Sequence, residues 1–186
     1  MNNKDKFELY AQTLREWSEK MNLVAPSTLA DIQTRHFADS AQLANVLPGD
    51  ASIIDLGSGA GFPGVVLAIL GYNVTCIESI GKKVAFLTEI KEKLGLSDLT
   101  IYHGRVEDFI AKTPVNAGKT VFTARAFAPL IKILDYVAKT KCRLFLLEGR
   151  EIGSEINTAK TKYNFDYDLI KSETGDGFIT IIQNIR

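Results

Sequence analysis

A run of glycines directly after a short apolar segment constrains the fold of this chain more than any other feature. Residues 52–56 read Ser-Ile-Ile-Asp-Leu and are followed by glycines at positions 57, 59, 61 and 64. The apolar segment predicts a buried strand, and the glycines let the backbone turn sharply after it with no Cβ atoms in the way. A helix is expected at residues 62–70, with its first amide groups turned toward a ligand on the bare loop. The stretch therefore predicts a ligand-binding unit of strand, loop and helix.

Apolar runs and helix-like segments alternate along the rest of the chain. Further strands are expected at residues 73–78, 99–103, 120–125 and 143–148, and further helices at 82–94, 129–139 and 151–163. Such alternation predicts a doubly wound sheet of parallel strands. The last two strands, at 167–170 and 178–184, are joined by a segment too short for a crossover helix and should pair as a hairpin. The predicted fold class is α/β and Rossmann-like, a mostly parallel seven-stranded sheet with one antiparallel strand.

Two helices are expected ahead of this sheet. Apolar residues recur at three- and four-residue spacings over residues 4–21, and a second helix should cover residues 27–46 with Ser27 as its cap. A Pro-Gly-Asp turn signal closes this part of the chain. We therefore expect one domain, with a helical preface at residues 1–49 and a Rossmann-like core at residues 50–186.

The glycines alone do not decide which ligand the loop binds. Residues 59–64 also fit the dinucleotide pattern G-x-G-x-x-G. Asp55, just before the loop, favours S-adenosylmethionine, because a carboxylate can meet a cationic ammonium or sulfonium group and would repel a pyrophosphate. Glu78 ends the second strand, where an acidic residue hydrogen-bonds ribose hydroxyls in either kind of site. After the third strand, Glu107 could meet an adenine edge, whereas Asp108 is equally well explained as a helix cap.

The net charge of the whole chain hides a difference between its segments. The net charge is zero, yet residues 81–143 hold 12 basic and 6 acidic side chains, and the rest of the chain is acidic. A basic middle segment is compatible with a nucleic acid but also with solvated helix faces. Cys76 and Cys142 lie in apolar stretches without neighbouring ligands, so no metal site is expected. No apolar run is long enough to span a bilayer, and we expect a cytoplasmic monomer without a membrane partner.

Several segments, taken together and in this order, resemble one known family. They are Trp17 with residues 21–23, residues 35–40 (Arg-His-Phe-Ala-Asp-Ser), the loop at 55–64, residues 78–83, residues 105–107 (Arg-Val-Glu), and residues 124–128 (Ala-Arg-Ala-Phe-Ala). The family is that of the bacterial small-subunit rRNA guanine-N7 methyltransferases, first described as glucose-inhibited division protein B. Because the segments are spread over most of the chain, the resemblance is specific.

The resemblance implies an S-adenosylmethionine-dependent methyltransferase that modifies N7 of one guanosine in the 530 loop of 16S rRNA, in the small ribosomal subunit. It carries cofactor contacts over to Gly57, Phe62, Val106, Glu107 and Arg125. With the residues of the loop and of the second strand, the expected cofactor-binding set becomes Asp55, Gly57, Ser58, Gly59, Phe62, Pro63, Glu78, Val106, Glu107 and Arg125. The fifth strand departs from the family, because Glu148 stands where the family commonly has lysine.

The implied reaction needs few groups from the protein. N7 of guanine has a free lone pair, so methyl transfer requires no general base, only an in-line approach and stabilisation of charge. Residues 123–127 accordingly lack both the Asn/Asp-Pro-Pro-Tyr/Phe segment of amino-group methyltransferases and the Pro-Cys of cytosine-C5 enzymes. Arg125 is the expected catalytic residue, donating to guanine O6 or a phosphate or anchoring the cofactor, and Phe127 could stack on the base. The candidate RNA contacts are Arg35, His36, Lys82, Lys83 and Phe127, and His36 could instead pack the preface over the site.

Three other functions fit part of the pattern. The first is a non-catalytic S-adenosylmethionine-binding module that acts in ribosome assembly. The second is an NAD-dependent oxidoreductase, disfavoured by Asp55 and by the lack of a Tyr-x-x-x-Lys pair. The third is a small-molecule methyltransferase, disfavoured by the basic middle segment.

Overall fold

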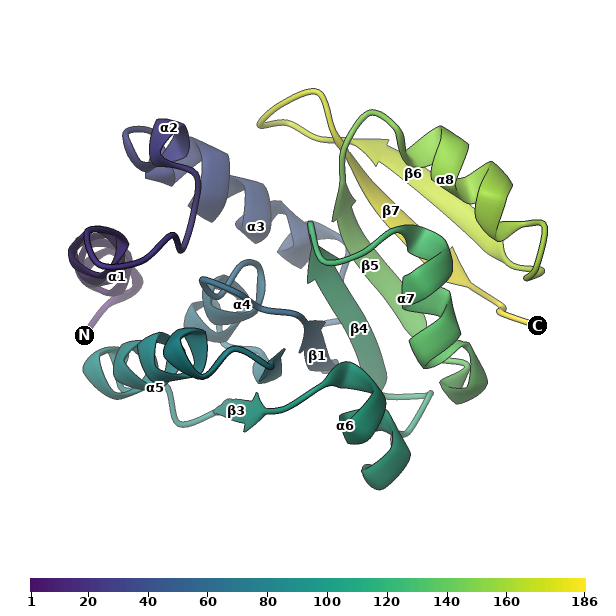
Figure 1. Cartoon of the computed structure of the whole chain (residues 1–186), viewed down its shortest axis with the longest axis horizontal. Coiled ribbons are helices and arrows are strands. Elements are labelled where there is room, and N and C mark those ends of the chain that lie inside the picture. The colour runs from purple at the N-terminus through teal and green to yellow at the C-terminus, as the bar shows by residue number, and fades with distance from the viewer.

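Seven strands form one twisted sheet through the centre of the molecule in the computed structural model, which describes residues 1–186 (Figure 1). The strands are β1 (Ser52–Leu56), β2 (Asn73–Glu78), β3 (Leu99–His103), β4 (Thr120–Arg125), β5 (Arg143–Glu148), β6 (Asp166–Lys171) and β7 (Phe178–Gln183). Their order in the sheet is β3-β2-β1-β4-β5-β7-β6, and only β7 runs antiparallel to its neighbours. The predicted α/β class, the hairpin and the single antiparallel strand are confirmed.

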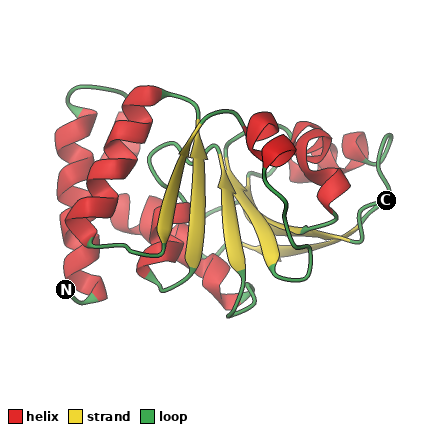
Figure 2. Cartoon of the chain, turned by 90° about the horizontal axis from the view of Figure 1, so that it is seen from below, coloured by secondary structure: helices red, strands yellow, loops and turns green.

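Helices cover both faces of this sheet (Figure 2). One face packs against α1 (Asn3–Ser18), α4 (Gly64–Ile69) and α5 (Gly81–Leu94), and the other against α6 (Val106–Lys112), α7 (Leu130–Val137) and α8 (Ile152–Ala159). A short 3₁₀ turn, η3 (Ala138–Thr140), follows α7. Each layer has its own hydrophobic cluster, which is the arrangement expected of a doubly wound sheet. No helix in the structure is both long and apolar enough to span a membrane.

Some helix boundaries differ from those predicted. α6 was not expected, because it is short and buries only Val106 and Phe109. Asp108 lies inside the first turn of α6 and is not its cap, a position taken by Arg105. α4 begins at Gly64, so that Pro63 precedes the helix instead of forming its first turn.

The second helix of the preface is not continuous, contrary to the prediction. It is divided into α2 (Pro26–Leu29), a π-helical segment η1 (Gln33–Ala38), α3 (Asp39–Ala41) and a 3₁₀ turn η2 (Gln42–Asn45). Ser27 is not a cap, because the helix begins one residue earlier, at Pro26. In an α-helix the Asp39 N–H would bond the carbonyl of Arg35, but here it bonds those of Thr34 and His36. The carbonyl of Arg35 instead accepts a hydrogen bond from Arg125, at 3.0 Å.

Aromatic side chains fix the preface on the glycine loop. Tyr10 of α1 is fully buried, donates a hydrogen bond to the Ala60 carbonyl and stacks on Phe62 with ring centroids 5.5 Å apart. Phe37 packs beside both rings. α1 also lies along α5, as Figure 1 shows on the side of the N-terminus. The preface and the loop therefore share one hydrophobic cluster.

Candidate active site

The glycine loop is shaped by left-handed backbone conformations, and the Glu78 carboxylate holds it on the side of β2. Gly57, Gly59 and Gly61 have φ angles of 65°, 57° and 92°, which side chains with a Cβ atom rarely adopt. Glu78, at the end of β2, accepts the N–H of Gly59 at 2.9 Å and that of Ile80 at 2.8 Å. A carboxylate has about four acceptor positions. Glu78 therefore fixes the loop and can still accept hydrogen bonds from ribose hydroxyls.

A pocket of about 260 Å³ opens next to this carboxylate and is called the cofactor pocket below. It is lined by Gly57, Ile77, Glu78, Ser79, Lys83, Gly104, Arg105, Val106, Glu107, Ala126, Phe127 and Tyr136. Four residues of the predicted cofactor set are thus brought together, namely Gly57, Glu78, Val106 and Glu107. An acidic residue at a strand end, a bare glycine turn and an apolar wall suit the ribose, the amino-acid end and the adenine of S-adenosylmethionine.

Phe127 lies against the glycine loop inside this pocket. A Cβ atom placed on Gly57 would overlap with the Phe127 ring, which also packs against Tyr136 with centroids 6.1 Å apart. Only a glycine at position 57 leaves room for this ring. The structure therefore places Phe127 in the wall of the cofactor pocket, next to Gly57 and Ala126.

Asp55 does not reach the cofactor pocket, and the prediction that it contacts the cofactor directly is corrected. Its side chain is fully buried beneath the loop. One carboxylate oxygen accepts the hydroxyl of Thr123 at 2.9 Å, and the other accepts the N–H of Gly64 at 3.2 Å. Burial raises the pKa of Asp55 to about 6, against the opposing effect of these hydrogen bonds. Asp55 thus joins β1, β4 and the start of α4 and orders the loop from below.

Replacing Asp55 by asparagine should flatten the dependence of stability on pH. Because the pKa of Asp55 is raised on folding, the wild-type protein should lose unfolding free energy as the pH rises from about 4 to about 6. The loss from this group is on the order of 2–3 kcal/mol. Asparagine stays neutral at every pH, and its side-chain amide can still form hydrogen bonds with the Thr123 hydroxyl and the Gly64 N–H. Urea unfolding of both proteins at several pH values measures the difference.

The exposed Asp50 supplies the control, as Asp50→Asn changes the same charge at the surface. Its profile should follow that of the wild type. A profile for Asp55→Asn that also follows the wild type would contradict a buried, titrating Asp55.

Three other residues of the predicted cofactor set support the loop from behind. The Ser58 hydroxyl donates to the Asp55 carbonyl at 3.1 Å. Phe62 is buried between Tyr10 and His36, and Pro63 is buried at the start of α4. None of the three lines the cofactor pocket, because the side chains on this part of the loop turn toward the preface and the sheet.

Arg125 points away from the cofactor pocket and toward the preface. Its guanidinium lies 3.4 Å from an Asp39 carboxylate oxygen, donates to the Arg35 carbonyl at 3.0 Å and to His36 Nδ1 at 2.8 Å, and lies 5.6 Å from the Phe62 ring centroid. Ala126 follows with φ of 50°, a left-handed conformation that turns Phe127 back to the cofactor pocket. Arg125 does not line the cofactor pocket, so its expected contact with the cofactor stays a prediction, and the contacts that it makes here join β4 to the preface.

His36 is a buried, neutral residue and not a surface contact for RNA, which corrects that prediction. Burial lowers the pKa of His36 to about 4, and the neighbouring Arg125 adds to the shift. Because arginine cannot accept a hydrogen bond, Nδ1 is the acceptor and Nε2 carries the proton, which it donates to Thr28 at 2.8 Å. The ring also stacks on Phe62, with centroids 4.8 Å apart.

A second pocket of about 280 Å³ lies on the other side of Ala126, between the preface, the end of β5 and the β6-β7 hairpin. It is lined by Thr28, Arg35, Asp39, Arg125, Ala126, Leu147, Glu148, Gly149, Ser172, Thr174, Gly175, Asp176, Gly177 and Phe178. Of the residues that line this pocket, the sequence predicts only Arg35 and Arg125 near a substrate, and it does not predict that the β6-β7 hairpin closes a pocket. The departure from the family at Glu148 was the one signal in the sequence that pointed here. Burial raises the pKa of Glu148 to about 7, and Glu155 adds to the rise.

Comparison with known proteins agrees with this architecture. Residues 3–174 match the family model of rRNA small subunit methyltransferase G. The ribosomal RNA small subunit methyltransferase G of Hyphomonas neptunium is 41% identical over 97% of this chain and 87% of its own length. The protein of the same name from Methylobacterium nodulans is 40% identical over 90% and 81%.

Solved structures share the fold at low sequence identity. A mutant of MtNAS in complex with S-adenosylmethionine has a TM-score of 0.62 at 12% identity, covering 97% of this chain and 76% of the other. The Pyrococcus abyssi tRNA (uracil-54, C5)-methyltransferase in complex with S-adenosyl-L-homocysteine has a TM-score of 0.54 at 13% identity, covering 79% and 37%. The fold is therefore the Rossmann-like fold of S-adenosylmethionine-dependent methyltransferases.

Proposed function

The chain belongs to the family of rRNA small subunit methyltransferase G, and on this premise we propose that it transfers the methyl group of S-adenosylmethionine to N7 of a guanosine in 16S rRNA. The names of the relatives support methylation of small-subunit rRNA and disfavour the non-catalytic and NAD-dependent alternatives. The choice of guanine N7, and of the 530 loop as its location, rests on the resemblance of the sequence and on the chemistry of the site.

One observation carries the choice of N7. Ala126 lines both the cofactor pocket and the second pocket, and neither Ala126 nor the next residue, Phe127 of the cofactor pocket, has a group that can take a proton. Methylation of an exocyclic amino group releases a proton, whereas methylation of N7 does not. The junction therefore suits a nitrogen that already has a free lone pair.

The proposed methyl transfer needs neither an acid nor a base. S-adenosylmethionine supplies the methyl group; the N7 lone pair forms the new bond to carbon, and the electrons of the broken carbon–sulfur bond remain on sulfur. The positive charge passes from sulfonium to the purine ring. The contribution of this chain is to hold the two reactants in line through Gly57, Glu78 and Phe127.

Methyl transfer to isolated small ribosomal subunits tests the proposal. Subunits from cells that lack the gene should accept labelled methyl groups from S-adenosylmethionine, and mass mapping of the 16S rRNA should find N7-methylguanosine at one position. Methylation at a base other than guanine, or at another atom of guanine, would refute the N7 assignment. Absence of any transfer to rRNA would refute the proposed function.

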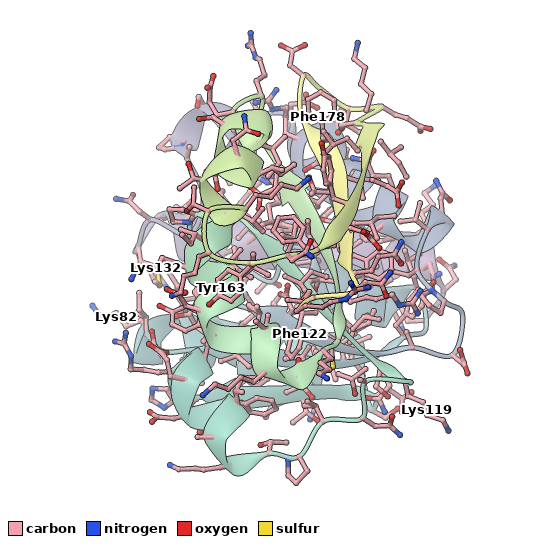
Figure 3. The ribbon with its side chains drawn as sticks, turned by 90° about the vertical axis from the view of Figure 1, so that its right-hand side faces the viewer. Lys82, Lys119, Phe122, Lys132, Tyr163 and Phe178 are labelled. Carbon is pink, nitrogen blue, oxygen red and sulfur yellow. The ribbon has the colours of Figure 1, made fainter.

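Lysines next to the cofactor pocket should contact RNA phosphates. Lys82 and Lys83 begin α5, and Lys83 lines the cofactor pocket. Lys82 lies on the same side of the molecule as Lys132, whereas Lys119 lies on the opposite side (Figure 3). We expect Lys82→Ala with Lys83→Ala to weaken RNA binding and to reduce the salt slope of log K by about 1 per lysine. Filter binding of 16S rRNA at several salt concentrations measures both quantities.

Lys119→Ala with Lys141→Ala is the matched control. These lysines precede β4 and β5, at the opposite ends of the parallel strands, and the charge change is the same. The salt slope of log K for RNA binding by this double variant should equal that of the wild type. An equal reduction in both double variants would mean that the contribution of Lys82 and Lys83 is nonspecific.

A further inference from the structure

The second pocket is enclosed by three segments that are far apart in the sequence. The preface contributes Arg35 and Asp39, the β4 and β5 ends contribute Arg125 and Glu148, and the β6-β7 hairpin closes the pocket. In Figure 1 the loop of this hairpin reaches toward the preface above the ends of β4 and β5. The pocket adjoins the cofactor pocket at Ala126. A group bound there would lie beside the position of the reactive methyl.

Hydrogen bonds hold these walls in place. Asp39 accepts the Thr174 hydroxyl at 2.7 Å and the Gln42 amide at 2.9 Å. Gln42 also donates to Ser172 at 3.0 Å and accepts the Glu173 N–H at 3.1 Å. The hairpin is thus joined to the preface by side chains on both sides. The pocket is formed before any ligand enters.

Glu148 is the one partly buried carboxylate in this pocket without a partner. Asp39 is paired with Arg125, and Asp176 is paired with Arg150 at 3.1 Å. The Glu148 side chain has no hydrogen bond and no ion pair, although it is only partly accessible to solvent. Its backbone is fixed, because Gly177 of the hairpin packs so closely that a Cβ atom would overlap with the Glu148 carbonyl oxygen. The two oxygens of this carboxylate are therefore available to a ligand with adjacent donors.

Guanine is the nucleobase with such donors. Its Watson–Crick edge presents N1–H beside the exocyclic N2 amine, and a carboxylate can accept both in a bidentate, charge-assisted pair. Adenine and cytosine each place an unprotonated ring nitrogen beside their amine, and uracil has a single N–H. We propose, on the basis of the function proposed above, that the second pocket binds the target guanine and that Glu148 selects it by accepting hydrogen bonds from N1–H and N2.

This orientation suits the reaction. N7 lies on the edge of guanine away from N1 and N2, so it is free to face Ala126 and the cofactor pocket. Methylation makes the ring cationic, and Glu148 in its ionised form, which predominates above its pKa of about 7, stabilises the charge that develops in the transition state. Arg35 also lines the pocket without a side-chain partner and can take the phosphate of the bound nucleotide. Glu148 is thus a specificity-determining residue where the family commonly has lysine.

A comparison of two nucleotides tests this assignment in the full-length protein. GMP and IMP differ only in the N2 amine, so the ratio of their dissociation constants reports the contact to that amine. Measured by NMR titration with S-adenosylhomocysteine present, the wild type should bind GMP about 5- to 100-fold more tightly than IMP. In Glu148→Gln the ratio should fall close to one. Methyl transfer to small subunits should fall about 10- to 100-fold in the same variant.

Glu151→Gln is the matched control, since Glu151 is exposed, lies three residues away and does not line the pocket. It should keep both the nucleotide ratio and the rate of the wild type. Equal binding of GMP and IMP by the wild type, or an unchanged ratio in Glu148→Gln, would overturn the assignment of Glu148. If the wild type still forms N7-methylguanosine in rRNA, only this inference fails; if it does not, the proposed function fails.

Discussion

Gly57→Ala is expected to reduce the affinity for S-adenosylhomocysteine about 100-fold, because the new methyl group displaces the Phe127 ring that lines the cofactor pocket. Two costs act together. The φ of 65° disfavours alanine by about 1–2 kcal/mol. The new methyl group would also overlap with the Phe127 ring, which must then move into the cofactor pocket or out of it. Isothermal titration calorimetry measures the affinity, and thermal unfolding measures the stability.

Gly95→Ala is the control that separates backbone strain from overlap with the Phe127 ring. Gly95 ends α5 with a similar φ of 61°, and a Cβ atom there would meet nothing within 4 Å. The variant should be destabilised to a similar extent by backbone strain while its cofactor affinity stays unchanged. If Gly57→Ala binds S-adenosylhomocysteine as well as Gly95→Ala does, the cofactor pocket has been assigned to the wrong side of the loop.

Arg125→Ala is expected to loosen residues 26–45 on the sheet, although their core contacts remain, and to reduce methyl transfer strongly. The guanidinium is the link between β4 and three groups of the preface, namely the Asp39 carboxylate, the Arg35 carbonyl and the His36 ring. Removing a partly buried charge with these partners should cost about 2–3 kcal/mol. The rate should fall by more than the affinity for S-adenosylhomocysteine, because the preface lines the second pocket and not the cofactor pocket.

Hydrogen exchange of backbone amides shows which residues lose structure in Arg125→Ala. The amides of residues 26–45 should lose protection in Arg125→Ala while those of the central strands keep it. Arg125→Lys should restore little, because a lysine cannot reproduce the forked contacts of a guanidinium. Arg143→Ala removes another arginine that lies over an aromatic ring, that of Phe145, but at the amino end of β5. It should leave exchange in the preface unchanged, and unchanged exchange in Arg125→Ala as well would exclude Arg125 as the link.

The core of the fold could be predicted because its signals are local. β2, β3, β4 and β5 have the predicted bounds, since each is a short run rich in apolar residues between turn signals. The second helix of the preface could not be predicted in the same way. Its π-helical segment around Arg35 depends on Arg125, which is distant in the sequence, and no periodicity of residues 27–46 reports that contact.

The features of the candidate site likewise fall into those with a local sequence signal and those that depend on tertiary contacts. The sheet, the glycine turn and the carboxylate at the end of β2 could be predicted from residue order, because strand propensity, bare glycine backbone and a residue at a strand end act within a few positions of the chain. Three side-chain positions emerge only from folding: Asp55 is buried under the loop, Arg125 contacts the preface, and Glu148 lines a pocket closed by the hairpin. These side-chain positions depend on packing between segments that are far apart in the sequence. No local pattern of residues reports that packing.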